Sequence, residues 1–216
     1  MVPGQTPRGH ATKQGILEVA TAIASVEGLE GLTLGRLATD LSMSKSGLFA
    51  HFGSKEELQL ATIEHARQIY VEQVILPGLA HSPGIATLHG LCESYVALME
   101  QRVFPGGCFF AAAMAEFDAR PGVVRDTIAA LQRQWLDMLE AAAGDGIGAG
   151  ELDGSVDPIQ LAFELEAAML SANWYFHLYN DARFFVLSRS AIRRTISAAA
   201  SSKGQQILEE VARPQA

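Results

Sequence analysis

Residues 32–58, LTLGRLATDLSMSKSGLFAHFGSKEEL, predict two short helices joined by a tight turn, followed by the beginning of a third helix. Thr33 has the side chain of an N-cap, and leucine and alanine then recur at helical spacing as far as Leu41. After a turn at 42–43, Ser44 is a second N-cap, and Gly53 ends the helix that it opens. Helices this short are not stable alone, so they must pack against neighbouring helices.

The second short helix divides into a docking face and an outer face. Met43, Leu48 and Phe52 are spaced to contact the neighbouring helices. The outer face keeps small, polar, basic or aromatic side chains, namely those of Lys45, Ser46, Gly47, Phe49 and His51. Apolar anchors behind and such groups in front are what a helix needs to enter a DNA major groove.

The longer series of motifs around this unit resembles the helix-turn-helix of the TetR family of transcriptional repressors. The resemblance covers about residues 12–60, including ILEVATAIASVEGLEGLTLGRLA at 16–38, LFAHF at 48–52 and SKEEL at 54–58. It implies an all-α protein with a three-helix DNA-binding domain at 12–54 and a larger helical domain for effector binding and dimerisation at 55–216. Residues 1–11 are expected to form a mobile arm in which Arg8 and His10 either touch DNA or are simply solvated.

The resemblance also implies the residues that contact DNA. They are Thr33, Ser44, Lys45, Ser46, Gly47, Phe49, His51 and Lys55. The family usually has glycine where Ser42 stands, and a serine in a left-handed turn costs about 1 kcal/mol. It usually has tyrosine where Phe49 stands, so a hydroxyl that would bond a phosphate is missing. We therefore expect DNA affinity to depend more strongly on Lys45, His51 and Lys55.

The charge balance argues against indiscriminate binding to nucleic acid. The 216 residues carry a formal net charge of −8, whereas such binding normally shows as an excess of lysine and arginine. Residues 1–60 hold 5 basic and 6 acidic side chains, and the remainder holds 11 and 18, so the acidity lies mostly in the second domain. Each subunit should make few phosphate contacts, and dimerisation is needed for useful affinity.

Composition and cysteine usage predict a cytoplasmic protein. With 49% hydrophobic and 19% charged residues the chain is globular, and it contains no uncharged apolar run of about 18 residues. The beginning, MVPGQTPRGH, lacks the apolar core of a signal peptide. Cys92 and Cys108 lack the paired spacing of a zinc site, so they are expected to be free thiols.

A long helix should connect the two domains. Ser54 and Glu57 form a capping box at its start, and Leu76-Pro77-Gly78 should end it near Ile75. Because a tilt at its far end would swing the DNA-binding helices, we expect this helix to transmit the effector signal.

The second domain is expected to be entirely helical. Ser82 and Pro83 predict the cap and first position of a helix that runs to about Arg102. A short helix is expected at 108–117 and long helices at about 123–143, 158–179 and 183–200, with a surface loop at the glycine-rich residues 144–155. The resemblance implies that the last two helices meet their copies across a two-fold axis, which would place the DNA-binding helices on a pseudo-palindromic operator. Alternatively, both complete the core of a monomer.

A site for a small, largely apolar effector is the further expectation for this domain. Candidate residues are the aromatic, methionine and polar side chains Tyr95, Met99, Phe109, Phe117, Trp135, Glu166, Asn173, Trp174 and His177. Glu166, Asn173 and His177 share one helical face, and a buried polar group without a partner costs about 1 to 3 kcal/mol. These groups therefore bond one another, face water or line a cavity, while any one aromatic residue at helical spacing is more often plain core.

The resemblance implies a ligand-responsive repressor and not an enzyme. We expect the effector to release it from DNA; the alternative is an effector that strengthens DNA binding. The chain has no Glu-x-x-His arrangement, no glycine-rich phosphate loop after a strand and no Gly-x-Ser-x-Gly element, so no catalytic residue, metal or cofactor is expected. The alternative is a helical small-molecule-binding or protein-interaction module of the same fold that does not bind an operator.

Overall fold

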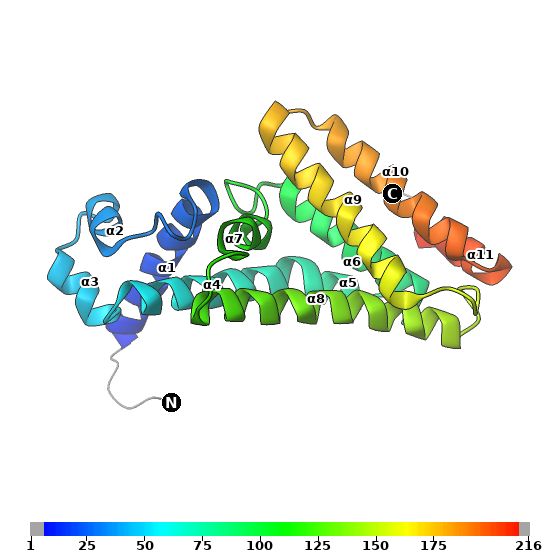
Figure 1. The fold of residues 1–216 in the computed structure, drawn as a ribbon, viewed down its shortest axis with the longest axis horizontal. Helices are drawn as coiled ribbons and strands as arrows, with labels where there is room; N and C mark the ends of the chain where they lie inside the picture. The colour runs from blue at the N-terminus through cyan, green and yellow to red at the C-terminus, as the bar shows by residue number, and fades with distance from the viewer. Residues whose placement is uncertain (1–6, 212–216) are drawn as a thin grey trace. The chain divides into compact units, whose positions relative to one another are not determined.

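The computed structural model describes residues 7–211, and its regular structure is helical apart from one antiparallel bridge between Leu152 and Ala200 (Figure 1). The all-α class predicted from the sequence is confirmed. In chain order the elements are α1 (Pro7–Glu27), α2 (Leu34–Asp40), α3 (Lys45–His51), α4 (Lys55–Tyr70), the π-helical turn η1 (Val71–Ile75), α5 (Leu76–Leu79), α6 (Ile85–Glu100), α7 (Phe109–Phe117), α8 (Val123–Gly148), α9 (Pro158–Tyr179), α10 (Arg183–Ala199) and α11 (Ser202–Val211). Within residues 7–211 no helix combines the length and apolar composition needed to cross a membrane.

The chain divides into two compact units. The N-terminal unit contains the described residues up to 69 together with 104–129, and the C-terminal unit contains 70–103 and the described residues from 130 onward. The chain therefore crosses between the units at three points, and not only through the helix that begins at Lys55. The functional boundary expected between residues 54 and 55 is a different division and stays a prediction.

The N-terminal unit is built around the buried faces of α1, α2, α3 and α4. Ile16, Leu37, Leu48 and Leu58, one from each helix, are at most 1% exposed. α1 begins at Pro7, five residues before the expected start, so part of the expected arm is helical. Residues 1–6 and the side chains of Arg8 and His10 lie outside the described part of the chain.

The expected helix break at Pro77 is wrong, because the backbone continues through η1 and α5 to Leu79. A proline in an α-helix leaves a carbonyl four residues earlier without its donor. Here the N–H of Leu76 bonds the Val71 carbonyl five residues back, so the preceding turn has already left the α-helical register. The helix therefore accommodates Pro77 after a π-turn.

The start of α6 was also predicted wrongly, at Ser82 and Pro83. Gly84 is the N-cap with φ of 100°, and the carboxylate of Glu151 accepts a hydrogen bond from the Ile85 N–H at 3.0 Å. A Cβ on Gly84 would lie 2.3 Å from that carboxylate, so only glycine fits. The cap lies 66 residues away in sequence, beyond the range of any local signal.

The C-terminal half of the chain departs from prediction at two further places. α8 extends to Gly148, so the first five residues of the expected surface loop are helical, and α11 was not predicted. α9 has the expected bounds, with Asp157 accepting from the Ile159 N–H at 3.0 Å, and α10 ends one residue early. α9 and α10 run side by side in opposite directions (Figure 1).

Candidate nucleic-acid interface and effector site

Two side-chain caps and one left-handed residue build the helix-turn-helix. Thr33 Oγ1 accepts from the Arg36 N–H at 3.1 Å and opens α2, and Ser44 Oγ accepts from the Gly47 N–H at 3.1 Å and opens α3. Both predicted caps are confirmed. Ser42, in the turn, has φ of 52°, the left-handed conformation for which glycine is the usual residue. A serine in this turn therefore costs conformational free energy that a glycine would not.

α3 presents its polar residues outward. Leu48 and Phe52 are at most 1% exposed and anchor the helix on its neighbours. The remaining positions are exposed at Ser44, Lys45, Ser46 and Phe49, and half-buried at Gly47 and His51. Phe49 is 54% exposed although it is aromatic. The split between docking face and outer face is the one that the spacing predicts.

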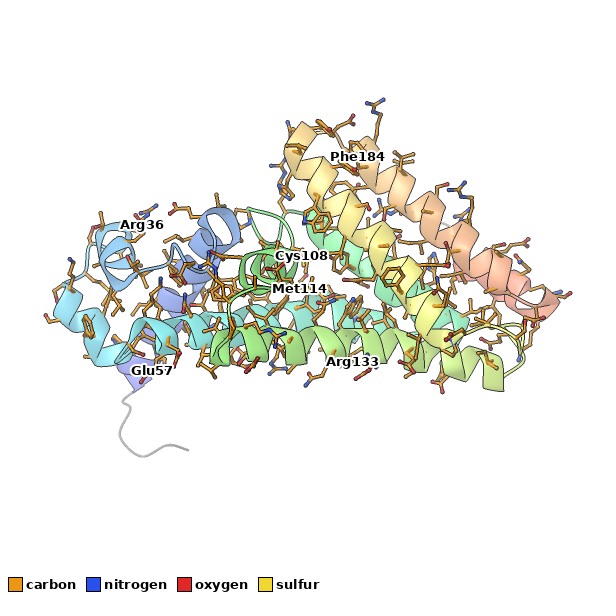
Figure 2. The ribbon with its side chains drawn as sticks, viewed as in Figure 1. Arg36, Glu57, Cys108, Met114, Arg133 and Phe184 are labelled. Atoms are coloured by element: carbon orange, nitrogen blue, oxygen red, sulfur yellow. The ribbon has the colours of Figure 1, made fainter. Side chains whose placement is uncertain are left out.

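Most cations of this unit are paired with carboxylates. Arg36 (Figure 2) bonds Glu27 at 2.8 Å and also Asp40, and Lys55 bonds Glu30 at 2.7 Å. The hydrogen bond from Arg36 lowers the pKa of Glu27, and the bond from Lys55 lowers the pKa of Glu30.

Two other lysines of the same unit, Lys13 and Lys45, have different surroundings. Lys13 Nζ lies 5.2 Å from the centre of the Phe52 ring. Lys45 is exposed, and among residues 7–211 it has no carboxylate within ion-pairing distance. Of the two lysines expected at DNA, Lys55 is thus paired with Glu30, whereas Lys45 has no carboxylate partner among the described side chains.

Three of the expected effector residues lie together in the C-terminal unit. Trp135 stacks on Tyr95 with ring centres 6.0 Å apart, and its Nε1 donates to Glu166 at 2.6 Å. Gln132 also donates to Glu166, at 3.0 Å, and Tyr70 packs edge-on against Trp135 at 5.5 Å. Gln132 and Tyr70 are not among the predicted effector residues, although Gln132 precedes Trp135 by three residues and so shares its helical face.

Glu166 is a buried carboxylate that is bonded to neutral donors. Burial raises its pKa, and the hydrogen bonds from Trp135 and Gln132 partly offset that effect. The nearby thiol of Cys92 also has a raised pKa, caused first by burial and then by the charge of Glu166. Cys92 and Cys108 are both buried, and no disulfide bond joins them.

The other expected effector residues lie in different surroundings. Met99 and Asn173 are buried, whereas Trp174 is 52% exposed. His177 is half-buried, and its buried Nε2 atom has no hydrogen-bond partner among the described residues. Burial, followed by the charge of Arg102, lowers its pKa. Phe109 and Phe117 are buried on α7 and belong to the N-terminal unit. Figure 2 labels Cys108, the N-cap of this helix, and Met114 in its middle.

Exposed apolar side chains lie along α9 and near the start of α10, and together they form what we call the apolar surface of α9 and α10. Each of the following side chains is at least 45% exposed: Ile159, Phe163, Trp174, Tyr175, Leu178, Tyr179, Val186 and Leu187. Near the turn between the helices, the ring centre of Phe184 (Figure 2) lies 5.1 Å from that of Tyr175 and 5.8 Å from that of Tyr179. Monomeric proteins rarely leave an apolar surface of this extent in water.

Comparison with known proteins identifies relatives of both halves. A model described as bacterial regulatory proteins of the tetR family matches residues 16–62, and a model of the tetracyclin repressor-like C-terminal domain matches residues 84–192. No curated protein matches the chain.

Three solved structures illustrate the shared fold. A TetR transcriptional regulator from Chloroflexus aurantiacus J-10-FL is 22% identical, with a TM-score of 0.84 over 90% of this chain and 98% of its own. A TetR-family regulator from Cytophaga hutchinsonii is 19% identical, with a TM-score of 0.81 over 93% and 100%. AibR, solved in complex with isovaleryl coenzyme A and operator DNA, is 22% identical, with a TM-score of 0.66 over 84% and 96%. At these identities the likeness shows the fold.

The family models cover the helix-turn-helix and most of the helices that follow it. Together with the capped α2 and α3 and the all-helical second unit, these matches show that the chain belongs to the TetR family of transcriptional regulators, which are non-enzymatic DNA-binding proteins.

Proposed function

We propose that this regulator is a repressor that binds a pseudo-palindromic operator as a homodimer and is released by a small, largely apolar effector. The outer face of α3 carries the proposal, because its helix is held by two buried anchors while its polar residues stay exposed. Two such helices, related by a two-fold axis and set about 34 Å apart, fit successive major grooves on one face of the duplex. Such a protein acts in the cytoplasm, where its operator is.

The DNA contacts divide into base readers and phosphate holders. We assign base edges to Lys45, Ser46, Gly47 and Phe49, which lie in or near the first turn of α3. We assign phosphates to Thr33, Ser44, His51 and Lys55. The hydroxyls of Thr33 and Ser44 accept from backbone N–H groups and still have an O–H to donate. To hold a phosphate, the Lys55 ammonium must either break its bond to Glu30 or bond Glu30 and the phosphate at the same time.

The second copy is assigned to the apolar surface of α9 and α10. This pairing would remove the exposed apolar side chains of α9 and α10 from water. Each Å² of apolar area buried contributes roughly 25 cal/mol to the free energy of association. A symmetric contact between the same helices of both subunits gives the two-fold relation that a palindromic operator requires.

The effector site is assigned to the C-terminal unit, within the larger functional domain expected after residue 54. Tyr95, Met99 and Trp135 supply apolar and aromatic surface, and Glu166, Asn173 and His177 supply a few polar groups. Small-molecule sites in proteins have this composition. The structure of AibR with isovaleryl coenzyme A and operator DNA supports the combination of effector and operator binding in a protein of this fold.

Selection from a pool of random duplexes tests the operator proposal directly. The purified wild-type protein should enrich a pseudo-palindromic sequence, and the same sequence should retard the protein in a gel shift. A reporter placed behind that sequence should be expressed more strongly when the gene is deleted. If no duplex is enriched at low ionic strength, the protein is not an operator-binding repressor.

A further inference from the structure

The carboxylate of Glu116 on α7 binds the backbone where α1 ends and the helix-turn-helix begins. Its Oε2 accepts from the Leu29 N–H at 2.7 Å, and its Oε1 accepts from the Glu30 N–H at 3.0 Å. Both oxygens are used, so the carboxylate fixes two consecutive peptide groups at once. Charge-assisted bonds of this kind are stronger than neutral ones.

The junction is shaped to receive this carboxylate. Gly28 ends α1 with φ of 85°, and a Cβ at that position would lie 2.8 Å from Glu116 Oε1. Leu29 is 1% exposed, so its N–H is removed from water and needs a partner in the protein. Glu116 therefore satisfies a backbone group that the two helices leave open.

The loop before α7 holds the same end of α1. The Gly106 N–H donates to Ser25 Oγ at 3.1 Å, and a Cβ on Gly106 would lie 1.8 Å from the Ser25 carbonyl oxygen. The segment 104–117 thus contacts the last turn of α1 at one point and the residues after it at another. Both contacts lie within the N-terminal unit.

α4 holds the same two residues from another direction. Gln59 Nε2 donates to the Leu29 carbonyl at 3.0 Å, and Lys55 bonds the Glu30 carboxylate. Leu32, three residues after Leu29, is completely buried, and Thr33, the N-cap of α2, follows it. The direction in which α2 leaves α1 is therefore set where α1, α4 and α7 converge.

We propose that Glu116 is a positioning residue for operator binding: through two backbone bonds it fixes the orientation of α2 and α3 against α1. The inference rests on the proposed operator function, and it makes the segment 104–117 part of the DNA-binding machinery although that segment lies far from α3 in sequence. Glu116 itself touches no DNA.

The substitution Glu116→Gln tests this role against a matched control. Gln keeps one acceptor but turns an amide N–H₂ toward a backbone N–H, so one bond is lost. Glu151→Gln removes the same charge in the C-terminal unit, at a carboxylate that caps α6 by accepting from one backbone N–H, that of Ile85. Operator affinity is measured by fluorescence anisotropy on the duplex that the wild-type protein selects, non-specific affinity on a scrambled duplex, and stability by urea unfolding.

We expect Glu116→Gln to lower operator affinity about tenfold and to leave affinity for the scrambled duplex unchanged or slightly raised. Removing a negative charge alone would strengthen both affinities, so the loss on the operator has the opposite sign to the charge effect. Glu151→Gln loses the same charge but can keep its single backbone bond through the amide oxygen, so it should keep its operator affinity. If the loss in Glu116→Gln came only from removing a carboxylate charge, operator affinity would change equally in both variants.

The inference is overturned if Glu116→Gln binds the operator as tightly as the wild type, or if Glu151→Gln loses as much affinity. If Glu116→Gln does not fold, Ser25→Ala carries the test, because it removes the acceptor of the Gly106 N–H; it should lower operator affinity about threefold. An unchanged affinity there overturns the inference. A wild-type protein that selects no operator contradicts the proposed function itself, which is a separate result.

Discussion

At the scale of single residues, Lys45 is well placed to meet DNA, because its side chain is exposed and no carboxylate of the described residues pairs with it. We predict that Lys45→Ala weakens operator binding by about 1 to 3 kcal/mol if it reads a base, because a bidentate contact to a base edge is lost. Anisotropy titrations on the selected duplex and on single-base variants measure this. A uniform loss across all sequences would assign Lys45 to a phosphate.

Lys55 provides a comparison within the same unit. Its ammonium already bonds Glu30, so DNA must compete with an existing partner and the net gain is smaller. Lys55→Ala should therefore cost less than Lys45→Ala. Lys203→Ala, in the C-terminal unit, controls for the loss of one positive charge. Equal losses for Lys45 and Lys55 would mean that the Glu30 pair opens in the complex.

The buried carboxylate of Glu166 should make stability depend on pH. Because burial raises its pKa in the folded protein, folding favours the protonated form. Its contribution is fully present below its ordinary pKa of 4.5 and is lost as the pH rises through the raised pKa. Glu166→Gln is neutral throughout, so it should become more stable than the wild type as the pH rises.

Urea unfolding between pH 4.5 and 8, at one protein concentration, measures that difference. Glu164→Gln, an exposed carboxylate on the same helix, controls for the loss of one charge. A gap between the wild type and Glu166→Gln that does not change with pH would show that Glu166 is already solvated or paired with a cation.

At the scale of elements, the cap at Ser44 combines two roles that substitution can separate. Ser44→Ala should destabilise α3 by about 1 kcal/mol and also weaken operator binding, because the cap and the phosphate donor are both lost. Ser44→Asp keeps a capping oxygen but places a negative charge beside phosphate. It should retain wild-type stability and still weaken binding, as hydrogen exchange and anisotropy would reveal. Tight operator binding by Ser44→Asp would remove Ser44 from the interface.

Element boundaries were predictable wherever the signal is local. Thr33, Ser44 and Asp157 each bond a backbone N–H within three residues, so their side chains alone mark the helix starts. The start of α6 was missed because its cap comes from Glu151, and the end of α5 was missed because a π-turn precedes Pro77. Contacts between distant residues and changes of helical register leave no local pattern.

In the candidate sites, too, local patterns were predictable and contacts between distant residues were not. The helical period placed Glu166 and Asn173 on one face, and both are buried. It did not identify Trp135 and Gln132 as the donors to Glu166, since that requires knowing that α8 packs beside α9. Phe109 was expected at the effector site from composition, yet α7 packs with the N-terminal unit. Periodicity finds an apolar face but not the helix that covers it.

At the scale of the whole molecule, the acidic charge and the paired cations limit what one subunit can do. With a net charge of −8 and most cations of the N-terminal unit held by carboxylates, a single copy gains little from phosphate contacts. Linking two DNA-binding units in one dimer makes the second binding event intramolecular and raises the affinity for the operator by about 10² to 10⁴. In the proposed dimer, the apolar surface of α9 and α10 is therefore central to operator affinity although it lies in the C-terminal unit.

Leu178→Glu tests this dependence, because Leu178 is 70% exposed near the end of α9 and is not part of the buried core. A glutamate on each copy would bury two like charges at the interface, so the variant should sediment as a monomer and bind the operator at least about 100-fold more weakly. Leu79→Glu, also in the C-terminal unit and 50% exposed on α5, should remain dimeric and bind normally. If Leu178→Glu stays dimeric, the subunits meet elsewhere. If it is monomeric but binds the operator fully, one α3 is sufficient and the pseudo-palindrome is unnecessary.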